Sequence, residues 1–293
     1  MSVASATFMR FFCGAFWFCF VVFGGVQAAS PSPTIAIPFE YCEGLLWVQV
    51  QVPQSTRPLN FILDTGADVS VINAGTAKAL RLKTGNWISV QGVHATLTGH
   101  WPARLTAQVA GVVLPSEYLA LDLSKLARSC GRPLDGLLGA DFVRGRVVQI
   151  DFASRQIRFP DAVSPAASDT VVPLELRHNS LCVSIGVNDA KNQWVRLDTG
   201  CATALQWVTS GTVVCVKPKK PAIGLVALAI PQAETRVSLG GSHFDPVPTG
   251  IHRRAIFAGE AGLLGNDLLS RFKTVTIDAG ANRLILGQLR AVN

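Results

Sequence analysis

Hydrophobic and polar residues alternate along much of the chain, and this pattern predicts β-strands. Val48, Val50 and Val52 alternate with glutamines, and a period of two places the valines on one face of a strand. Apolar, β-branched runs that flank short turns predict terminal hairpins in both halves of the chain. The two hairpins are expected at 147–151 with 156–159, and at 274–278 with 283–286. The pattern therefore predicts an all-β fold.

The order of predicted elements occurs twice. NFILDTGADVSVI and DGLLGADFVRGRVVQIDF in the first half correspond to QWVRLDTGCATAL and AGLLGNDLLSRFKTVTIDAG in the second. An internal duplication of this kind predicts two similar structural units. We expect an N-terminal lobe at 33–160 and a C-terminal lobe at 172–290, joined by a polar, Pro-containing linker at 161–171. Short helices are expected at 75–82, 141–144 and 267–271.

The N-terminal segment differs from the rest of the chain and predicts export. Arg10 precedes an uncharged, aromatic-rich run, and Val26-Gln27-Ala28 fits a small-residue cleavage site. We expect a signal peptide at 1–28 and a secreted or periplasmic protein. The alternative is a retained membrane anchor, because the uncharged run is long enough to span a bilayer. Both interpretations place the lobes outside the cytoplasm.

Charge and cysteine content change this picture little. The formal net charge of the 293-residue chain is +7, which is mild, and the basic cluster KPKKP at 217–221 predicts a solvated loop or a docking patch. Nucleic acid is not an expected partner. The segment after residue 28 contains five cysteines, Cys42, Cys130, Cys182, Cys201 and Cys215. Pairing within each half is compatible with export, but the sequence leaves the connectivity open.

The Asp-Thr-Gly triplets are the candidate chemical site. One triplet alone is a common turn sequence, but here each copy follows an apolar strand and precedes a Gly-Leu-Leu-Gly-x-Asp segment. LDTGADVSVI resembles the active-site strand of retroviral-type aspartic proteases. GLLGAD and GLLGND are similar to the segment that packs beneath that strand. The chain looks like two pseudo-symmetric retropepsin-like β-barrel lobes in tandem, arranged as in pepsin, with the active site between them.

The resemblance implies a pair of catalytic carboxylates, Asp64 and Asp198. Two carboxylates about 3 Å apart cannot both ionise, so such a pair shares one proton and activates a water molecule. Gly66 and Gly200 would let the backbone approach the carboxylates, since they lack Cβ. Thr65 and Thr199 would hydrogen-bond across the pseudo-dyad. No metal ion and no cofactor is expected in this chemistry.

The resemblance also implies a flap, a hairpin that closes over an extended peptide. We expect it near 93–101, where glycines permit tight turns. The second-lobe equivalent is unclear from the sequence. The peptide would bind by strand addition, with backbone hydrogen bonds for affinity and pockets for alternate side chains. The substrate-binding candidates in the flap are Val93, His94, Thr96 and Gly99.

The sequence therefore predicts an exported, single-chain aspartic endopeptidase that acts on peptides or proteins as a monomer. No His-Glu-x-x-His or Gly-x-Ser-x-Gly motif points to another hydrolytic chemistry. The alternative is a catalytically silent scaffold of the same fold that binds peptides or a partner protein. Asp, Thr and Gly are present in both copies, which favours the enzyme.

Overall fold

The computed structural model describes residues 35–93, 95–188, 190–211 and 230–291. The predicted signal peptide at 1–28, His94, Cys215 and the basic cluster at 217–221 lie outside the described residues. Among the residues that are described, no helix is both long and apolar enough to cross a membrane.

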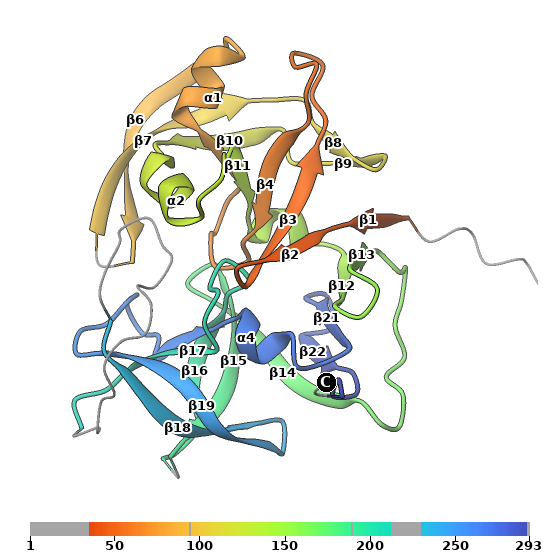
Figure 1. Cartoon of the computed structure of the whole chain (residues 1–293), viewed down its shortest axis with the longest axis vertical. Coiled ribbons are helices and arrows are strands. Elements are labelled where there is room, and N and C mark those ends of the chain that lie inside the picture. The colour runs from red at the N-terminus through yellow and green to blue at the C-terminus, as the bar shows by residue number, and fades with distance from the viewer. Residues whose placement is uncertain (1–34, 94, 189, 212–229, 292–293) are drawn as a thin grey trace, which may run out of the picture. The chain divides into compact units, whose positions relative to one another are not determined.

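The first lobe comprises the elements from β1 to β13, and most of its strands form one eight-stranded sheet in the order β2-β3-β4-β11-β5-β10-β7-β6 (Figure 1). Its elements are β1 (Ala36–Pro38), β2 (Glu40–Cys42), β3 (Leu45–Val50), β4 (Leu59–Leu63), β5 (Val71–Asn73), α1 (Ala74–Ala79), β6 (Thr84–Gly92), β7 (Ala95–Arg104), β8 (Gln108–Val109), β9 (Val112–Val113), β10 (Glu117–Leu121), α2 (Ser124–Ser129), β11 (Gly136–Leu138), α3 (Ala140–Val143), β12 (Val147–Asp151) and β13 (Gln156–Arg158).

The second lobe, from β14 to β22, repeats the central connections of the first. In both lobes the Gly-Leu-Leu strand pairs in parallel with the strand before Asp-Thr-Gly and antiparallel with the strand after it. Its elements are β14 (Thr170–Arg177), β15 (Ser180–Val187), β16 (Gln193–Leu197), β17 (Leu205–Val208), β18 (Gln232–Leu239), β19 (Ser242–His252), β20 (Gly262–Leu264), α4 (Asn266–Leu269), β21 (Thr274–Asp278) and β22 (Arg283–Leu286).

A shared sheet joins the two lobes. The predicted terminal hairpins form, and their inner strands β12 and β21 pair antiparallel, with Gln149 opposite Thr276. Strands β1 and β14 complete this part of the sheet on its two sides, in the order β1-β13-β12-β21-β22-β14 (Figure 1). Each lobe thus contributes three strands, so the duplication in the sequence becomes a pseudo-symmetric sheet.

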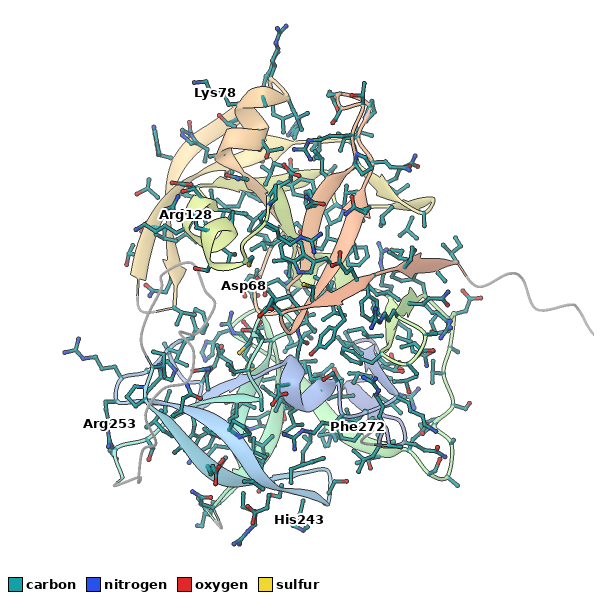
Figure 2. All side chains as sticks on the ribbon, in the orientation of Figure 1. Asp68, Lys78, Arg128, His243, Arg253 and Phe272 are labelled. Carbon is teal, nitrogen blue, oxygen red and sulfur yellow. The ribbon has the colours of Figure 1, made fainter. Side chains whose placement is uncertain are left out.

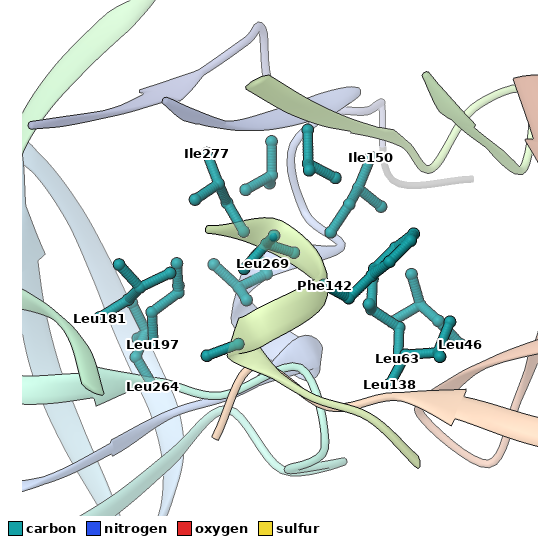
Figure 3. Packing of buried hydrophobic residues seen from close by; sticks show 14 of the residues in the cluster. Leu46, Leu63, Leu138, Phe142, Ile150, Leu181, Leu197, Leu264, Leu269 and Ile277 are labelled. Atoms are coloured by element: carbon teal, nitrogen blue, oxygen red, sulfur yellow. The ribbon is translucent and has the colours of Figure 1, made fainter. Parts of the chain in front are cut away.

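One apolar core continues from lobe to lobe beneath the Asp-Thr-Gly loops. Phe142 on α3 and Leu269 on α4 are buried in the same cluster as Ile150 and Ile277 of the shared sheet (Figure 3). Burying large apolar side chains stabilises a fold by roughly 1.5–3 kcal/mol each. Because residues of both lobes share this core, it supports both loops from one side.

The predicted helices form with small changes in their ends. The helix expected at 75–82 is α1, and Asn73 precedes it and accepts a hydrogen bond from the Gly75 N–H at 3.3 Å. The helices expected after each Gly-Leu-Leu-Gly are α3 and α4. Helix α2 was not predicted. Strand β14 begins at Thr170, inside the segment expected as the linker, and the lobe boundaries at 33–160 and 172–290 stay predictions.

Candidate active site

Asp64 and Asp198 lie at the ends of equivalent strands, and the fold brings their carboxyl groups together. The Asp64 N–H donates to the Leu138 carbonyl at 2.8 Å, and the Asp198 N–H donates to the Leu264 carbonyl at 2.9 Å. Each loop is therefore fixed to the Gly-Leu-Leu strand beneath it. The two carboxyl groups are within hydrogen-bonding reach of each other.

Backbone N–H groups orient each carboxylate. Asp64 Oδ1 accepts from the N–H groups of Gly66 at 3.0 Å and Ala67 at 3.2 Å, and Asp198 Oδ1 accepts from Gly200 at 2.9 Å. A Cβ added to Gly66 would lie 2.4 Å from the Asp198 carboxyl, and one added to Gly200 would lie 2.3 Å from that of Asp64. Both glycines are therefore required by the approach of the opposite lobe's carboxyl group.

Thr65 and Thr199 connect the two loops through reciprocal hydrogen bonds. The Thr65 hydroxyl donates to the Leu197 carbonyl at 2.7 Å and accepts from the Thr199 N–H at 3.1 Å. The Thr199 hydroxyl donates to the Leu63 carbonyl at 2.9 Å and accepts from the Thr65 N–H at 3.0 Å. Both threonines are fully buried. Four buried hydrogen bonds thus hold the two carboxylates in one geometry.

Comparison with known proteins agrees with this geometry. A family model described as aspartyl protease matches residues 48–142, which contain the first Asp-Thr-Gly and the first Gly-Leu-Leu-Gly. The aspartic proteinase from Irpex lacteus superposes with a TM-score of 0.59 at 12% identity, over 88% of this chain and 98% of that one. The family-model match and the shared fold support the aspartic protease superfamily for this chain. The solved structure shows the shared fold across both lobes.

A curated relative of the chain is a transposon protein. The retrovirus-related Pol polyprotein from transposon 412 of Drosophila melanogaster is 26% identical over 129 residues, 39% of this chain. The chain corresponds to only 10% of that polyprotein's length. The relationship therefore concerns a small part of a much longer protein.

The environment of the aspartic protease-like pair raises the pKa of both carboxyls. Burial raises the pKa of Asp64, while the hydrogen bonds from Asp198, Ala67 and Gly66 oppose that increase. Burial and the neighbouring Asp64 together raise the pKa of Asp198 well above its ordinary value. The Arg196 guanidinium acts in the opposite direction on both, because a nearby cation favours the ionised form. Such an environment favours a pair that shares one proton.

Arg196 was missed as a site residue in the sequence. It lies two residues before Asp198, and its Nη1 donates to the Gly66 carbonyl at 2.6 Å and lies 3.5 Å from Asp68 Oδ1. Its other nitrogens bind both oxygens of Glu260, at 2.9 and 2.7 Å. The Arg196 and Glu260 side chains are only 6% and 1% exposed, so this is a buried ion pair beneath the dyad.

The loops rest on different polar groups in the two lobes. In the first lobe, Asp141 accepts from the Ser70 N–H at 3.0 Å and the Ser70 hydroxyl at 2.7 Å, and the Ser70 oxygen accepts from the Gly139 N–H. In the second lobe Asp267 is half-exposed, and the buried Asn266 instead donates to the Thr199 carbonyl at 2.6 Å. The two Gly-x-Asp sequences therefore support the two loops in different ways.

A cleft of about 540 Å³ lies over the two aspartates, with residues of both lobes along its walls. Asp68 lines it, is half-exposed, and accepts from the Ser180 hydroxyl at 3.0 Å, so it is both a cleft residue and a link between lobes (Figure 2).

Cys201 also lines the cleft, and its thiol is free. No disulfide forms among the four described cysteines, Cys42, Cys130, Cys182 and Cys201. Pairing within each half is thus absent from the described part of the chain.

The expected flap corresponds to the hairpin of β6 and β7, whose turn follows Gly92. Val93 lines the cleft together with the β6 residues Ser89–Gly92. Thr96 is exposed and Gly99 packs against β10, where an added Cβ would lie 2.8 Å from the Ala120 carbonyl oxygen; neither lines the cleft. His94 lies outside the described residues.

No group of three or more His, Cys, Asp or Glu side chains is placed to hold a metal ion in the described ranges.

The two terminal hairpins each contain an aspartate that pairs with an arginine of the same hairpin. Asp151 pairs with Arg158 at 2.5 Å, and Asp278 pairs with Arg283 at 2.9 Å.

Proposed function

We propose that this chain is an exported aspartic endopeptidase in which Asp64 and Asp198 form the catalytic dyad. The observation that carries the proposal is the contact between the half-buried Asp64 carboxyl and the buried Asp198 carboxyl, one from each lobe, at the base of a cleft. Burial and mutual repulsion favour a singly protonated pair, which supplies a general base and a general acid in one site.

The proposed reaction is hydrolysis of a peptide bond by an activated water molecule. The ionised carboxyl group accepts a proton from water as its oxygen attacks the carbonyl carbon. The protonated carboxyl group donates a hydrogen bond to the carbonyl oxygen, and a proton then passes to the departing amine nitrogen. Because the pair titrates as a unit, neither role belongs permanently to Asp64 or Asp198.

An extended peptide is the substrate that this cleft fits best. Strand β6 is an edge strand of the eight-stranded sheet, and its residues Ser89–Gly92 line the cleft. Edge strands offer backbone N–H and C=O groups for pairing with another chain. The cleft is otherwise lined largely by apolar side chains, which suit the side chains of a peptide.

Cleavage of a mixed peptide library by the purified protein, analysed by mass spectrometry, tests the proposed function. Cleavage that is blocked by a pepstatin-like transition-state mimic and unaffected by a chelator supports it. Peptide binding without any cleavage between pH 3 and 8 contradicts it and supports a silent binding scaffold. The pH range covers the interval over which a carboxyl pair of raised pKa titrates.

Export is part of the proposal and rests on the sequence of residues 1–28. Cleavage after Ala28 would release a protein that begins at Ala29. Intact-mass analysis of protein from the exported fraction tests this step, and a full-length cytoplasmic product contradicts it.

A further inference from the structure

The two halves of the cleft have equivalent backbone positions but different side chains. In the first lobe Leu137 of β11 pairs with Ile62 on β4 and with Val71 on β5. In the second lobe the equivalent Leu263 of β20 pairs with Arg196 and Gln206 on the corresponding strands. Strand pairing thus makes Val71 equivalent to Gln206.

The next strand extends the comparison. Val71 pairs with Leu119 of β10, and Leu121 lies two residues farther along that strand. Gln206 pairs with Gly250 of β19, and His252 lies two residues farther along. His252 is therefore equivalent to Leu121, and Gly250 to Leu119. Of these residues, Val71, Leu119 and Leu121 line the first-lobe half of the cleft, and Gln206 and His252 line the second-lobe half.

The second-lobe half is built around a polar chain of side chains. Gln206 Nε2 donates to the Thr203 hydroxyl at 2.6 Å, and Gln206 Oε1 accepts from His252 Nε2 at 2.6 Å. Thr203 Oγ1 lies 3.2 Å from Cys201 Sγ, three residues after Asp198. Gln206 and His252 are each only 4% exposed. The chain of polar groups therefore runs from the wall of the cleft to the catalytic loop.

The backbone makes room for this arrangement. A Cβ at Gly250 would lie 2.2 Å from Gln206 Oε1, so the Gln206 side chain can keep this position only opposite a glycine. The first lobe has Leu119 at the equivalent position, and Val71 there is the smaller partner. In the first lobe the apolar Val71 lies opposite Leu119, whereas in the second lobe the larger, polar Gln206 lies opposite Gly250.

Arg196, which lines this half of the cleft, is already paired with acidic side chains. Both Glu260 oxygens and Asp68 Oδ1 lie within ion-pair distance of its guanidinium. An anionic ligand side chain therefore gains no free cation from Arg196, whereas a neutral hydrogen-bonding group can bind the polar wall without the loss of a full ionic hydration shell.

We propose that the second-lobe half of the cleft selects a neutral amide side chain, Gln or Asn, while the first-lobe half selects an aliphatic or aromatic one. The preferred ligand is then an extended peptide with an apolar residue and an amide residue on opposite sides of the dyad. This inference rests on the proposed function for its peptide ligand. An aliphatic side chain over Gln206 and His252 would exclude water from polar groups and give them no new partner.

Peptide binding to the Asp64→Asn variant tests the inference separately from catalysis. For each of the two positions that flank the bond over the dyad, one peptide with Gln and one with Leu at that position are titrated by fluorescence anisotropy. The two peptides of a pair are otherwise identical. At one of the two positions the Gln peptide should bind about tenfold more tightly, the effect of roughly one buried hydrogen bond. Equal or tighter binding of the Leu peptide at both positions overturns the inference.

Variants that exchange the lobes' chemistry give a second test. Gln206→Val with His252→Leu installs the first-lobe residues, and this double variant should reverse the preference in favour of Leu. His243→Leu is the matched control, because His243 lies on the same strand β19, is exposed and does not line the cleft (Figure 2). A Gln preference that survives the double exchange overturns the inference.

Two further measurements keep the outcomes separate. The single variant Gln206→Glu retains the side-chain shape and should shift the preference from Gln toward Lys, which tests the wall even if the double variant unfolds. Absence of cleavage by the unmodified protein contradicts the proposed function, whereas the ratio of binding constants still decides the preference of the pocket.

Discussion

The buried pair of Arg196 and Glu260 offers a sharp test of how the second lobe differs from the first. The equivalent residues in the first lobe are Ile62 and Leu134, both almost fully buried. Replacement of Arg196 by Ile leaves Glu260 with a side chain only 1% exposed and without its cation. An uncompensated buried charge of this kind costs about 3–5 kcal/mol.

The double variant Arg196→Ile with Glu260→Leu should recover most of that loss. It removes both charges together and installs the aliphatic pair that the first lobe already accommodates. Exchange of a buried ion pair for apolar residues is neutral or stabilising by about 1–4 kcal/mol. The Gly66 carbonyl, which accepts from Arg196 at 2.6 Å, loses a donor, and this costs about 1 kcal/mol.

The assay is urea unfolding of the three proteins at one pH, with stability from the midpoint and the slope m. We expect the single variant to be several kcal/mol less stable and the double variant to lie within about 2 kcal/mol of the unmodified protein. A double variant as unstable as the single variant would refute the reasoning, because it would mean that the second lobe cannot pack an aliphatic pair there.

The same double variant should change the pH dependence in a defined direction. Arg196 lowers the pKa of both Asp64 and Asp198. Its removal raises the pKa of the dyad, so the acidic limb of kcat/KM should move to higher pH. A limb that stays in place, or moves to lower pH, would show that the guanidinium does not influence the dyad.

Four further predictions follow from single positions. Burial raises the folded-state pKa of Asp198 above the unfolded value of about 3.9, so the ionised carboxylate destabilises the folded protein at pH 7. Asp198→Asn should therefore raise the melting temperature at pH 7 but not below about pH 4, and an equal gain at both pH values contradicts this. Thr65→Val should cost about 1–3 kcal/mol in urea unfolding, because a buried carbonyl and a buried N–H lose their partner, while Thr65→Ser should cost much less. Ala67→Ser should move the acidic limb of kcat/KM to lower pH by supplying a donor to Asp64, and an unchanged profile would refute it. Protein from the exported fraction should have the mass of a chain that begins at Ala29.

The fold was largely predictable because its signal is local. Strand alternation and the repeated Gly-Leu-Leu-Gly segment predicted the all-β architecture and both terminal hairpins. The antiparallel pairing of β12 with β21 was not predicted, because it joins residues such as Gln149 and Thr276 that are far apart in the chain. Helix α2 was missed as well, since Ser124–Ser129 is short and its N-cap residue Leu123 makes no side-chain capping bond.

The candidate site was predictable where chemistry and motif coincide. Asp64 and Asp198 meet as their repeated motif implied. Arg196 carried a visible signal, a charge within the apolar run WVRLDTG, but its partner Glu260 is distant in sequence. The role of Gln206 and His252 depends on strand register, and a one-residue shift between the lobes makes Gln206 equivalent to Val71 rather than to Ile72.

The flap shows how a glycine can mislead. Gly99 suggested a tight turn, yet it lies within β7 and its lack of a Cβ permits close packing against Ala120 of β10. The turn instead follows Gly92, so the cleft-lining side of the hairpin is Ser89–Val93. Sequence alone does not distinguish a glycine needed for turning from one needed for close approach.

The most direct test of the central claim is peptide cleavage by Asp64→Asn, Asp198→Asn and an equal mixture of the two. Each variant should lose activity by several orders of magnitude, because the carboxylates act as one unit, and the mixture should stay inactive, because both must lie in one chain. Asp267→Asn changes a half-exposed acid of the same lobe; it is the matched control and should retain activity. Near-full activity of Asp198→Asn, or recovery of activity on mixing, would contradict the account and indicate a site assembled between two chains.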